Sequence, residues 1–106
     1  MQISSSDTKQ RLAAGEVTLL DCREPGEYQL CRIDGALLIP MREIPMRLQE
    51  VDSLAEQKTV VVYCHHGVRS LNVTNWLRQQ GVENVQSMAG GIDDWSVSID
   101  PAVPRY

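Results

Sequence analysis

The sequence predicts an α/β domain: a central, mostly parallel β-sheet with helices on both faces. Short, continuously apolar strand segments alternate with helical segments, a pattern typical of parallel sheets that are covered on both sides. The clearest strand, residues 60–63, is followed within a few residues by the clearest helix, residues 70–80. A length of 106 residues suffices for one hydrophobic core, so residues 1–106 are expected to form a single domain.

The first half of the chain should contain two strands. Serine and aspartate side chains offer N-caps for a helix over residues 8–14, which the following glycine would end. Residues 17–21 and 35–39 are short and apolar, as buried strands are. The Pro-Gly pair at residues 25–26 marks a turn or a short helical start. A short helix is expected over residues 41–51, where a proline is tolerable only near the helix start.

The second half should supply the centre of the sheet. Residues 60–63 combine three valines and a tyrosine, the composition of a buried strand. The helix over residues 70–80 places apolar side chains near one face and ends at a glycine. A further strand over residues 84–88 and a short helix over residues 92–97 complete the pattern.

Composition and charge exclude several classes of function. The net charge of −4 is spread along the chain, and no basic stripe could neutralise a run of phosphates, so no nucleic-acid partner is expected. No apolar run approaches a membrane span, and the first residues lack the layout of a signal peptide, so a cytoplasmic location is expected. Three cysteines without a C-x-x-C pair argue against a disulfide framework or a zinc ribbon. We expect a monomer or weak dimer.

The most informative segment is the loop Cys64-His65-His66-Gly67-Val68-Arg69 between the central strand and its helix. Ligands of parallel sheets bind beyond the carboxyl ends of the strands, which is where this loop lies. A helix N-terminus and an inward-curled backbone offer N–H groups and positive potential, and Gly67 permits the curl. A cysteine placed there should ionise readily, which favours a nucleophilic sulfur facing an anionic substrate. The alternative is an inert, buried Cys64.

The two histidines have less specific roles. His65 and His66 are adjacent to Cys64 in one tight loop, so the three side chains would rarely converge on one metal ion, and no metal site is expected. We expect one or both rings to line the mouth of a pocket, as hydrogen-bond donors to an anion or as part-time cations. They could also be solvated loop residues.

Four segments along nearly the whole chain form one pattern by their order and spacing. They are Leu20-Asp21-Cys22-Arg23-Glu24-Pro25-Gly26-Glu27-Tyr28, then Ile33-Asp34-Gly35-Ala36 with Ile39-Pro40, then residues 64–70, and last Gly90-Gly91-Ile92 with Trp95. This pattern resembles the rhodanese-like family. This resemblance implies a five-stranded α/β fold and a cysteine that alternates between thiol and persulfide. The closing segment, residues 95–106, also looks like the ends of rhodanese modules fused to sulfur-carrier-activating enzymes.

Carried over to this chain, the resemblance makes Cys64 the sulfur carrier and residues 65–69 a cradle of backbone amides. The family's Asp and Arg fall on Asp21 and Arg23. Asp21 is expected to be structural, bonding loop amides or Arg69, with a substrate role as the alternative. Arg23 could attract an anionic sulfur donor or pair with an acidic neighbour.

The other two cysteines are less clear. Many family members have Gly-His where this chain has Cys31-Arg32. A cysteine there could resolve a persulfide or form a regulatory disulfide if it lay close to Cys64, or it could be an ordinary, partly buried thiol. Cys22 follows Asp21 on a strand, so its side chain should point to the opposite face and pack in the core.

The loop length favours sulfur over phosphorus chemistry. Phosphatases and arsenate reductases of this fold place five residues between cysteine and arginine, whereas here there are four. We therefore expect a thiosulfate sulfurtransferase-like enzyme, in which Cys64 attacks the donor, helped by Arg69, Arg23 and loop amides. Its expected partners are a small anionic sulfur donor and a thiol, cyanide or protein acceptor, with no cofactor beyond the Cys64 persulfide. The alternatives are a noncatalytic sulfur-carrier or protein-binding module and a phosphatase-like or arsenate-reducing enzyme.

Overall fold

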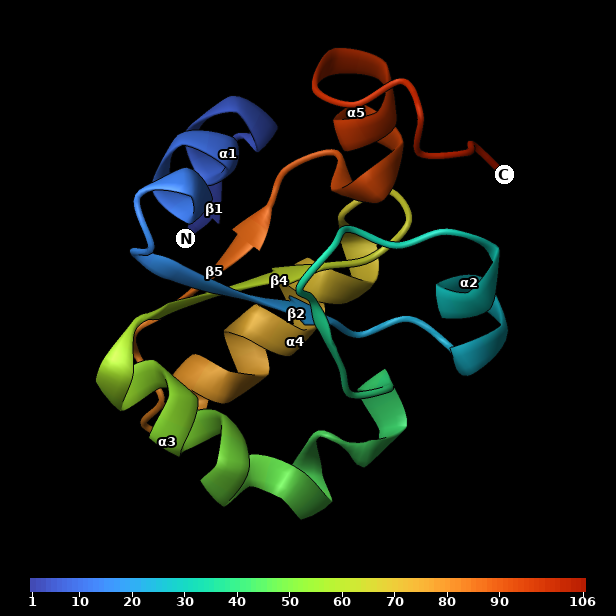
Figure 1. Ribbon diagram of the computed structural model, residues 1–106. Coiled ribbons are helices and arrows are strands. Elements are labelled where there is room, and N and C mark those ends of the chain that lie inside the picture. The colour runs from blue at the N-terminus through green and yellow to red at the C-terminus, as the bar shows by residue number, and fades with distance from the viewer.

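The protein is built around a five-stranded sheet whose strands all run parallel, in the order β1-β5-β4-β2-β3 (Figure 1). The computed structural model describes all residues from 1 to 106. Central strands β2 and β4 pair over five residues, from Val17 opposite Thr59 to Asp21 opposite Tyr63. The strands are β1 (Gln2–Ile3), β2 (Val17–Asp21), β3 (Leu37–Leu38), β4 (Thr59–Tyr63) and β5 (Val85–Met88).

Helices cover both faces of this sheet, as is typical of sheets whose strands are all parallel. In Figure 1, α1 and α5 lie on one side and α3 and α4 on the other, while α2 stands beyond the end of β2. The helices are α1 (Ser5–Ala13), α2 (Pro25–Leu30), α3 (Leu48–Gln57), α4 (Val68–Gln79) and α5 (Gly91–Ser98), with two 3₁₀ turns at Met41–Glu43 and Pro45–Arg47. None of these helices has the length and hydrophobicity needed to cross a membrane.

Two apolar clusters fill the space between the sheet and its helices. One joins Val60 and Val62 of β4 to Val73 and Leu77 of α4, and includes Cys64. The other lies across the sheet and joins Val61 and Tyr63 of β4 to residues of α5 and the C-terminal segment. Side chains alternate between the clusters along each strand because successive residues point to opposite faces. The uninterrupted apolar strands are thus explained by burial on both sides.

The predicted fold class is confirmed, and the sheet is parallel throughout. The sequence reading missed β1, since a two-residue strand is too short to show a pattern. It also made β3 too long, since only Leu37 and Leu38 pair with β2.

Three helix predictions were wrong at their boundaries. Helix α1 begins at Ser5, three residues before the predicted start at residue 8. The helix expected over residues 41–51 is divided into two 3₁₀ turns and α3, which continues to Gln57. Pro45 begins the second 3₁₀ turn, and prolines favour the first position of a helical segment. Helix α4 begins at Val68, earlier than the predicted residue 70. Consequently Val68 and Arg69 belong to the first turn of α4, and the loop itself is only Cys64–Gly67.

Candidate active site

The loop after β4 curls so tightly that Cys64 faces the first turn of the helix that follows. Gly67 is the N-cap of α4 and has φ of 100°, a left-handed conformation that disfavours any side chain. A Cβ atom there would also lie 3.1 Å from the backbone nitrogen of Gly90. The expected role of Gly67 in allowing the curl is therefore matched by the structure.

The Cys64 sulfur is held as an anion. It accepts hydrogen bonds from the backbone N–H groups of Gly67, at 3.1 Å, and Ser70, at 3.3 Å, and from the Ser70 hydroxyl at 3.5 Å. The neighbouring Cys22 thiol makes the largest contribution, and together with the Ser70 and Gly67 donors it lowers the pKa of Cys64 to about 4, against the opposing effect of burial. Ser87 completes the arrangement, since its hydroxyl lies 2.8 Å from that of Ser70. At neutral pH the sulfur is a thiolate.

Further N–H groups of the same loop remain available. The backbone amides of His65, His66, Val68 and Arg69 donate no hydrogen bond within the chain. The first amides of any helix lack intrahelical acceptors, which explains why the Val68 and Arg69 amides at the start of α4 are unengaged. The segment that follows the thiolate thus carries four unengaged donors. This is an arrangement that suits a second sulfur atom or a bound anion.

The start of α5 holds the loop through backbone hydrogen bonds. Ile92 and Asp93 donate their N–H groups to the carbonyl oxygens of Cys64, at 2.9 Å, and His65, at 3.1 Å. Gly91 lies so close that a Cβ atom there would be 2.5 Å from the Cys64 carbonyl oxygen and 2.4 Å from that of His65. Gly91 is therefore needed for the close approach of the two backbones.

Arg69 braces the loop instead of reaching for an anion. Its guanidinium donates two parallel hydrogen bonds to Glu27 of α2, at 2.8 and 2.9 Å, which is the bidentate geometry that arginine and carboxylates prefer. Arg69 is the main reason that the pKa of Glu27 falls to about 2. The Tyr106 hydroxyl donates to the same carboxylate. The sequence led us to expect that Arg69 helps to bind the donor, whereas the structure pairs its guanidinium with Glu27.

Asp21 and Arg23 form a buried ion pair, which matches the structural role expected of Asp21 and one of the two roles left open for Arg23. Both side chains are fully buried, and the Arg23 guanidinium donates to Asp21, to the Cys31 carbonyl oxygen and to Tyr106. Asp21 therefore bonds Arg23 and not Arg69. Arg23 pairs with its acidic neighbour, and with its donors engaged it presents no free N–H to an anionic sulfur donor.

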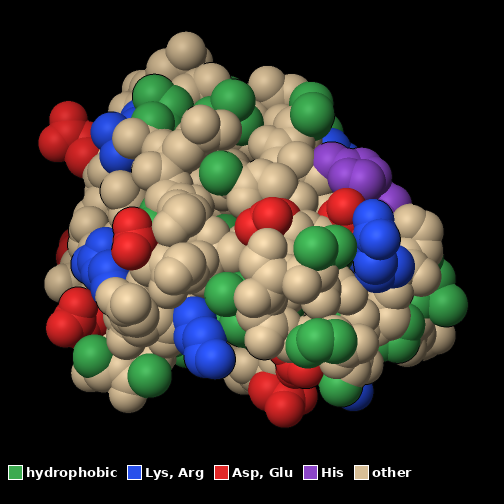
Figure 2. All heavy atoms as spheres, turned by 90° about the horizontal axis from the view of Figure 1, so that it is seen from above, with side chains coloured by type: hydrophobic (Ala, Val, Ile, Leu, Met, Phe, Trp, Pro, Cys, Tyr) green, Lys and Arg blue, Asp and Glu red, His purple; other side chains and the backbone are tan.

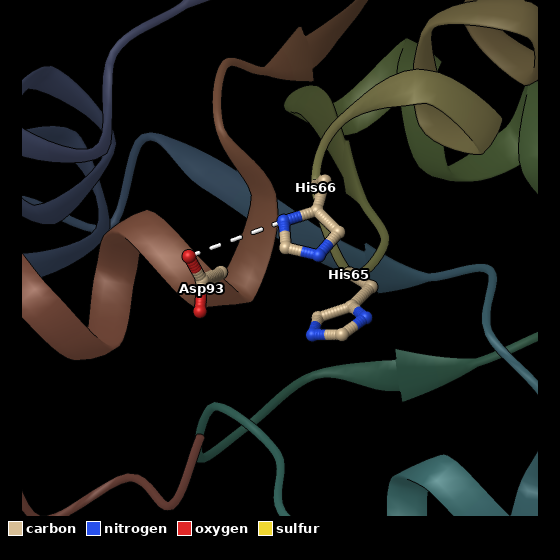
Figure 3. A group of neighbouring side chains, drawn as sticks. All are labelled: His65, His66 and Asp93. Atoms are coloured by element: carbon tan, nitrogen blue, oxygen red, sulfur yellow. Dashed lines mark ion pairs between the residues drawn. The ribbon is translucent and has the colours of Figure 1, made fainter. Parts of the chain in front are cut away.

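The histidines lie at the outer edge of the loop (Figure 3). His65 is stacked between His66 and Tyr106, with ring centroids 3.9 and 3.8 Å apart. The side chain of His66 is 62% exposed, and its Nδ1 lies 3.9 Å from Asp93. Both histidine rings lie on the surface beside acidic and basic side chains in Figure 2. A position at the rim is what the sequence suggested.

This rim is poorly suited to a metal ion, although His65, His66 and Asp93 have ligand atoms within 4.8 Å of one another. Imidazole lone pairs lie in the ring plane, so two stacked rings do not direct them at one point. Asp93 is also engaged by Arg105 at 2.9 Å, which lowers the pKa of its carboxyl group. The geometry favours stacking and hydrogen bonding over coordination.

The three cysteines divide between the two faces of the sheet. Cys22 lies in the same apolar cluster as Cys64, on the face opposite to Asp21, as predicted. Cys31 lies in the other cluster, 3.8 Å from the Arg23 guanidinium. The sheet thus separates Cys31 from Cys64, which removes the basis for expecting Cys31 to resolve a Cys64 persulfide.

Access to the sulfur is restricted. Cys64 is 1% exposed, and neither of the two surface hollows is lined by it. One hollow lies near Met41 and Trp76, and the other lies between Cys31 and the C-terminal segment. A reactant must therefore displace side chains at the loop rim, where His65, His66 and Tyr106 are stacked on one another.

Comparison with known proteins identifies the architecture. The sequence model of the rhodanese-like domain matches residues 4–98. The chain belongs to this family. Three segments carried the resemblance near the site: the loop, the early Asp-x-Arg segment and the Gly-Gly pair. In the structure of this rhodanese-like domain they lie around one site.

Individual relatives support the same assignment. A sulfurtransferase of Allochromatium vinosum is 40% identical over 96 residues, which cover 90% of this rhodanese-like domain and 87% of that protein. The chloroplastic Rhodanese-like/PpiC domain-containing protein 12 of Arabidopsis thaliana is 36% identical over 92 residues, but these are only 31% of its length. The human single-domain sulfurtransferase TSTD1 has a TM-score of 0.81 at 27% identity, with 92% of this chain and 96% of that chain covered.

Sequence reasoning missed four residues that shape the site of this rhodanese-like domain. Ser70 directly follows Arg69 at a helix start, so its amide and hydroxyl could have been suspected as donors. Glu27 was noticed only as part of a motif, and nothing in the sequence pairs it with Arg69. Ser87 and Tyr106 are remote from the loop in sequence, and only the fold brings them close.

Proposed function

We propose that this rhodanese-like domain is a sulfurtransferase that carries a sulfane sulfur as a persulfide on Cys64. The observation that carries the proposal is the sulfur itself, an anion held by the Gly67 and Ser70 amides at the start of α4. A thiolate of low pKa attacks sulfur readily, and the same amides stabilise the anion that forms. The relatives named as sulfurtransferases support the same reaction class.

The reaction is a double displacement. The Cys64 thiolate attacks the outer sulfur of a donor such as thiosulfate, a new S–S bond forms, and sulfite departs with the electron pair of the old one. The terminal persulfide sulfur carries the negative charge and takes hydrogen bonds from the unengaged amides of the loop. A thiophilic acceptor, such as cyanide, a thiol or a protein thiolate, then removes that sulfur and restores the thiolate.

The side chains around the loop act by positioning. Arg69, through Glu27, holds the first turn of α4 so that its amides point at the sulfur. The His65 and His66 rings form the edge that an incoming anion meets. No metal or organic cofactor enters the reaction, because the sulfur atom is itself the group that is transferred.

Intact-mass spectrometry after thiosulfate treatment tests this proposal. The wild-type chain should gain one sulfur atom, and cyanide should remove it. Cys64→Ser should gain none while keeping its fold, because the change is nearly isosteric. Cys31→Ser is the matched control, since Cys31 lies across the sheet, and it should load as the wild type does.

Steady-state assays then separate an enzyme from a passive carrier. With thiosulfate and cyanide, the wild type should turn over and Cys64→Ser should not. A wild-type chain that accepts no sulfur from thiosulfate, or a Cys64→Ser variant that keeps the activity, contradicts the proposal. A persulfide that forms without turnover would identify a sulfur carrier.

A further inference from the structure

Cys22 and Cys64 are neighbours across the two central strands. In the β2–β4 pairing, Asp21 stands opposite Tyr63, and each cysteine is the next residue along its strand. Cys22 extends the pairing by donating its N–H to the Tyr63 carbonyl oxygen at 3.1 Å. Adjacent strands lie about 4.8 Å apart, within the range of roughly 4.4–6.8 Å that disulfides span between Cα atoms. Both side chains enter the same apolar cluster.

The two thiols differ sharply in chemistry. Cys64 is a thiolate, whereas the side-chain hydrogen bond to Cys64, then burial and the negative charge of Cys64, raise the pKa of Cys22 far above that of an ordinary thiol. An oxidant therefore reacts with Cys64 first, since the thiolate is the reactive form. Cys22 stays protonated beside it, with its thiol 3.4 Å from the Tyr63 carbonyl oxygen.

We infer that Cys22 traps oxidised Cys64 as an intramolecular disulfide, which makes the pair a reversible peroxide-sensitive site. In the first step the Cys64 thiolate attacks a peroxide oxygen, the O–O bond breaks, and Cys64 becomes a sulfenic acid with release of water or hydroxide. In the second step the Cys22 sulfur attacks the Cys64 sulfur, the S–O bond breaks, and the Cys22 proton leaves with the hydroxyl as water. The two thiols lose two electrons, which reduce the peroxide.

The disulfide has two consequences for this site. It removes the nucleophile, so sulfur loading stops until a dithiol reduces the bond. It also protects Cys64 from further oxidation to the sulfinic and sulfonic acids, which cannot be reversed by a dithiol. Cys31 cannot serve in this way, because the sheet lies between it and Cys64.

Hydrogen peroxide provides the test, with tryptic peptide mapping as the readout. Trypsin places the three cysteines in three different peptides, which are residues 12–23, 24–32 and 59–69. After peroxide and before alkylation, the wild-type chain should be two hydrogens lighter. Alkylation and trypsin should then yield 12–23 linked to 59–69, with Cys31 alkylated. Dithiothreitol should release the link and restore alkylation of Cys64. A link from 59–69 to 24–32, or Cys64 sulfinic acid without any link, overturns the inference.

Two variants sharpen the comparison. Cys22→Ser should accumulate sulfinic or sulfonic acid on Cys64 and lose the recovery by dithiothreitol, whereas Cys31→Ser should behave as the wild type. Equal recovery in Cys22→Ser and wild type contradicts the inference. If Cys22→Ser does not fold, the wild-type peptide map decides alone. The test requires only that Cys64 is a thiolate, so its outcome is separate from that of the thiosulfate loading experiment.

Discussion

At the scale of single residues, the chemistry of Cys64 follows from its neighbours. An ordinary cysteine has a pKa of about 8.5, and burial alone would raise it. Here the opposite occurs, because the Cys22 thiol, the Ser70 hydroxyl and the amides of Ser70 and Gly67 all stabilise the charged form. Several weak donors directed at one sulfur atom outweigh desolvation. The residue itself contributes only the atom that ionises.

This balance predicts the pH dependence of Cys64 reactivity. The thiolate fraction is complete above the pKa of about 4 and falls only as the pH decreases through that value. The rate of iodoacetamide alkylation, followed by mass spectrometry on the 59–69 peptide, should therefore be nearly constant from about pH 6 to 8. Cys22→Ala should move the lower limit of this plateau upward, since it removes the largest stabilising contribution. A wild-type rate that rises about tenfold per pH unit in this range would show an ordinary thiol.

At the scale of secondary structure, two helix N-termini meet at one loop. The start of α4 supplies hydrogen bonds to the Cys64 sulfur, and the start of α5 supplies them to the carbonyl oxygens of Cys64 and His65. The loop is thereby held between the two helices, with its amides pointing inward and its carbonyl groups outward. Such a close approach requires Gly91, where any side chain would collide with the loop backbone.

Gly91→Ala should therefore disrupt the site from outside it. A Cβ 2.4–2.5 Å from two carbonyl oxygens, added to a φ of 62°, forces the loop or α5 to shift. We expect a loss of about 3 kcal/mol or more in the free energy of unfolding, measured by urea denaturation, with a slower alkylation of Cys64. Gly26→Ala is the matched control, because a Cβ there meets nothing within 4 Å and should change stability by less than about 1 kcal/mol. Equal effects of the two changes would disprove the close-approach argument.

At the scale of the whole molecule, a polar network connects β2, α2, α4 and the C-terminal segment, and it is fully buried at Asp21 and Arg23. Asp21 binds Arg23, Arg23 and Glu27 both bind Tyr106, and Glu27 binds Arg69. Each charge is compensated by the next, so the network carries no isolated buried ion. Residues from four parts of the chain must be in place before the loop is fixed.

Arg23→Met should show how strongly the network depends on its centre. The change leaves Asp21 as an uncompensated carboxylate in a fully buried position, which typically costs about 3–5 kcal/mol in the free energy of unfolding. Arg42→Met serves as the control, since its partner Glu24 is exposed and such pairs contribute little. Urea denaturation of both variants measures the difference. A small loss in Arg23→Met would mean that the pair is not needed for stability.

The sequence by itself determined the fold class, the order of the main elements and the place of the loop. These depend on local patterns: apolar runs at 17–21 and 60–63 identify buried strands, and a cysteine between a strand and a helix lies at the ligand-binding edge of a parallel sheet. Family resemblance added the persulfide chemistry and the candidate residues. Helix boundaries were less accurate, because α4 begins two residues before Ser70 and prolines divide the 41–51 segment.

Only the tertiary structure decided with which partner each polar group forms its hydrogen bonds or ion pair. The sequence left Arg69 and Arg23 free to bind a substrate, whereas the fold pairs one with Glu27 and buries the other against Asp21. It also placed Cys22, and not Cys31, beside Cys64. The physical reason is that such partners lie tens of residues apart along the chain, and their distance is set by strand register and by packing between elements. A local sequence pattern predicts neither the register nor the packing.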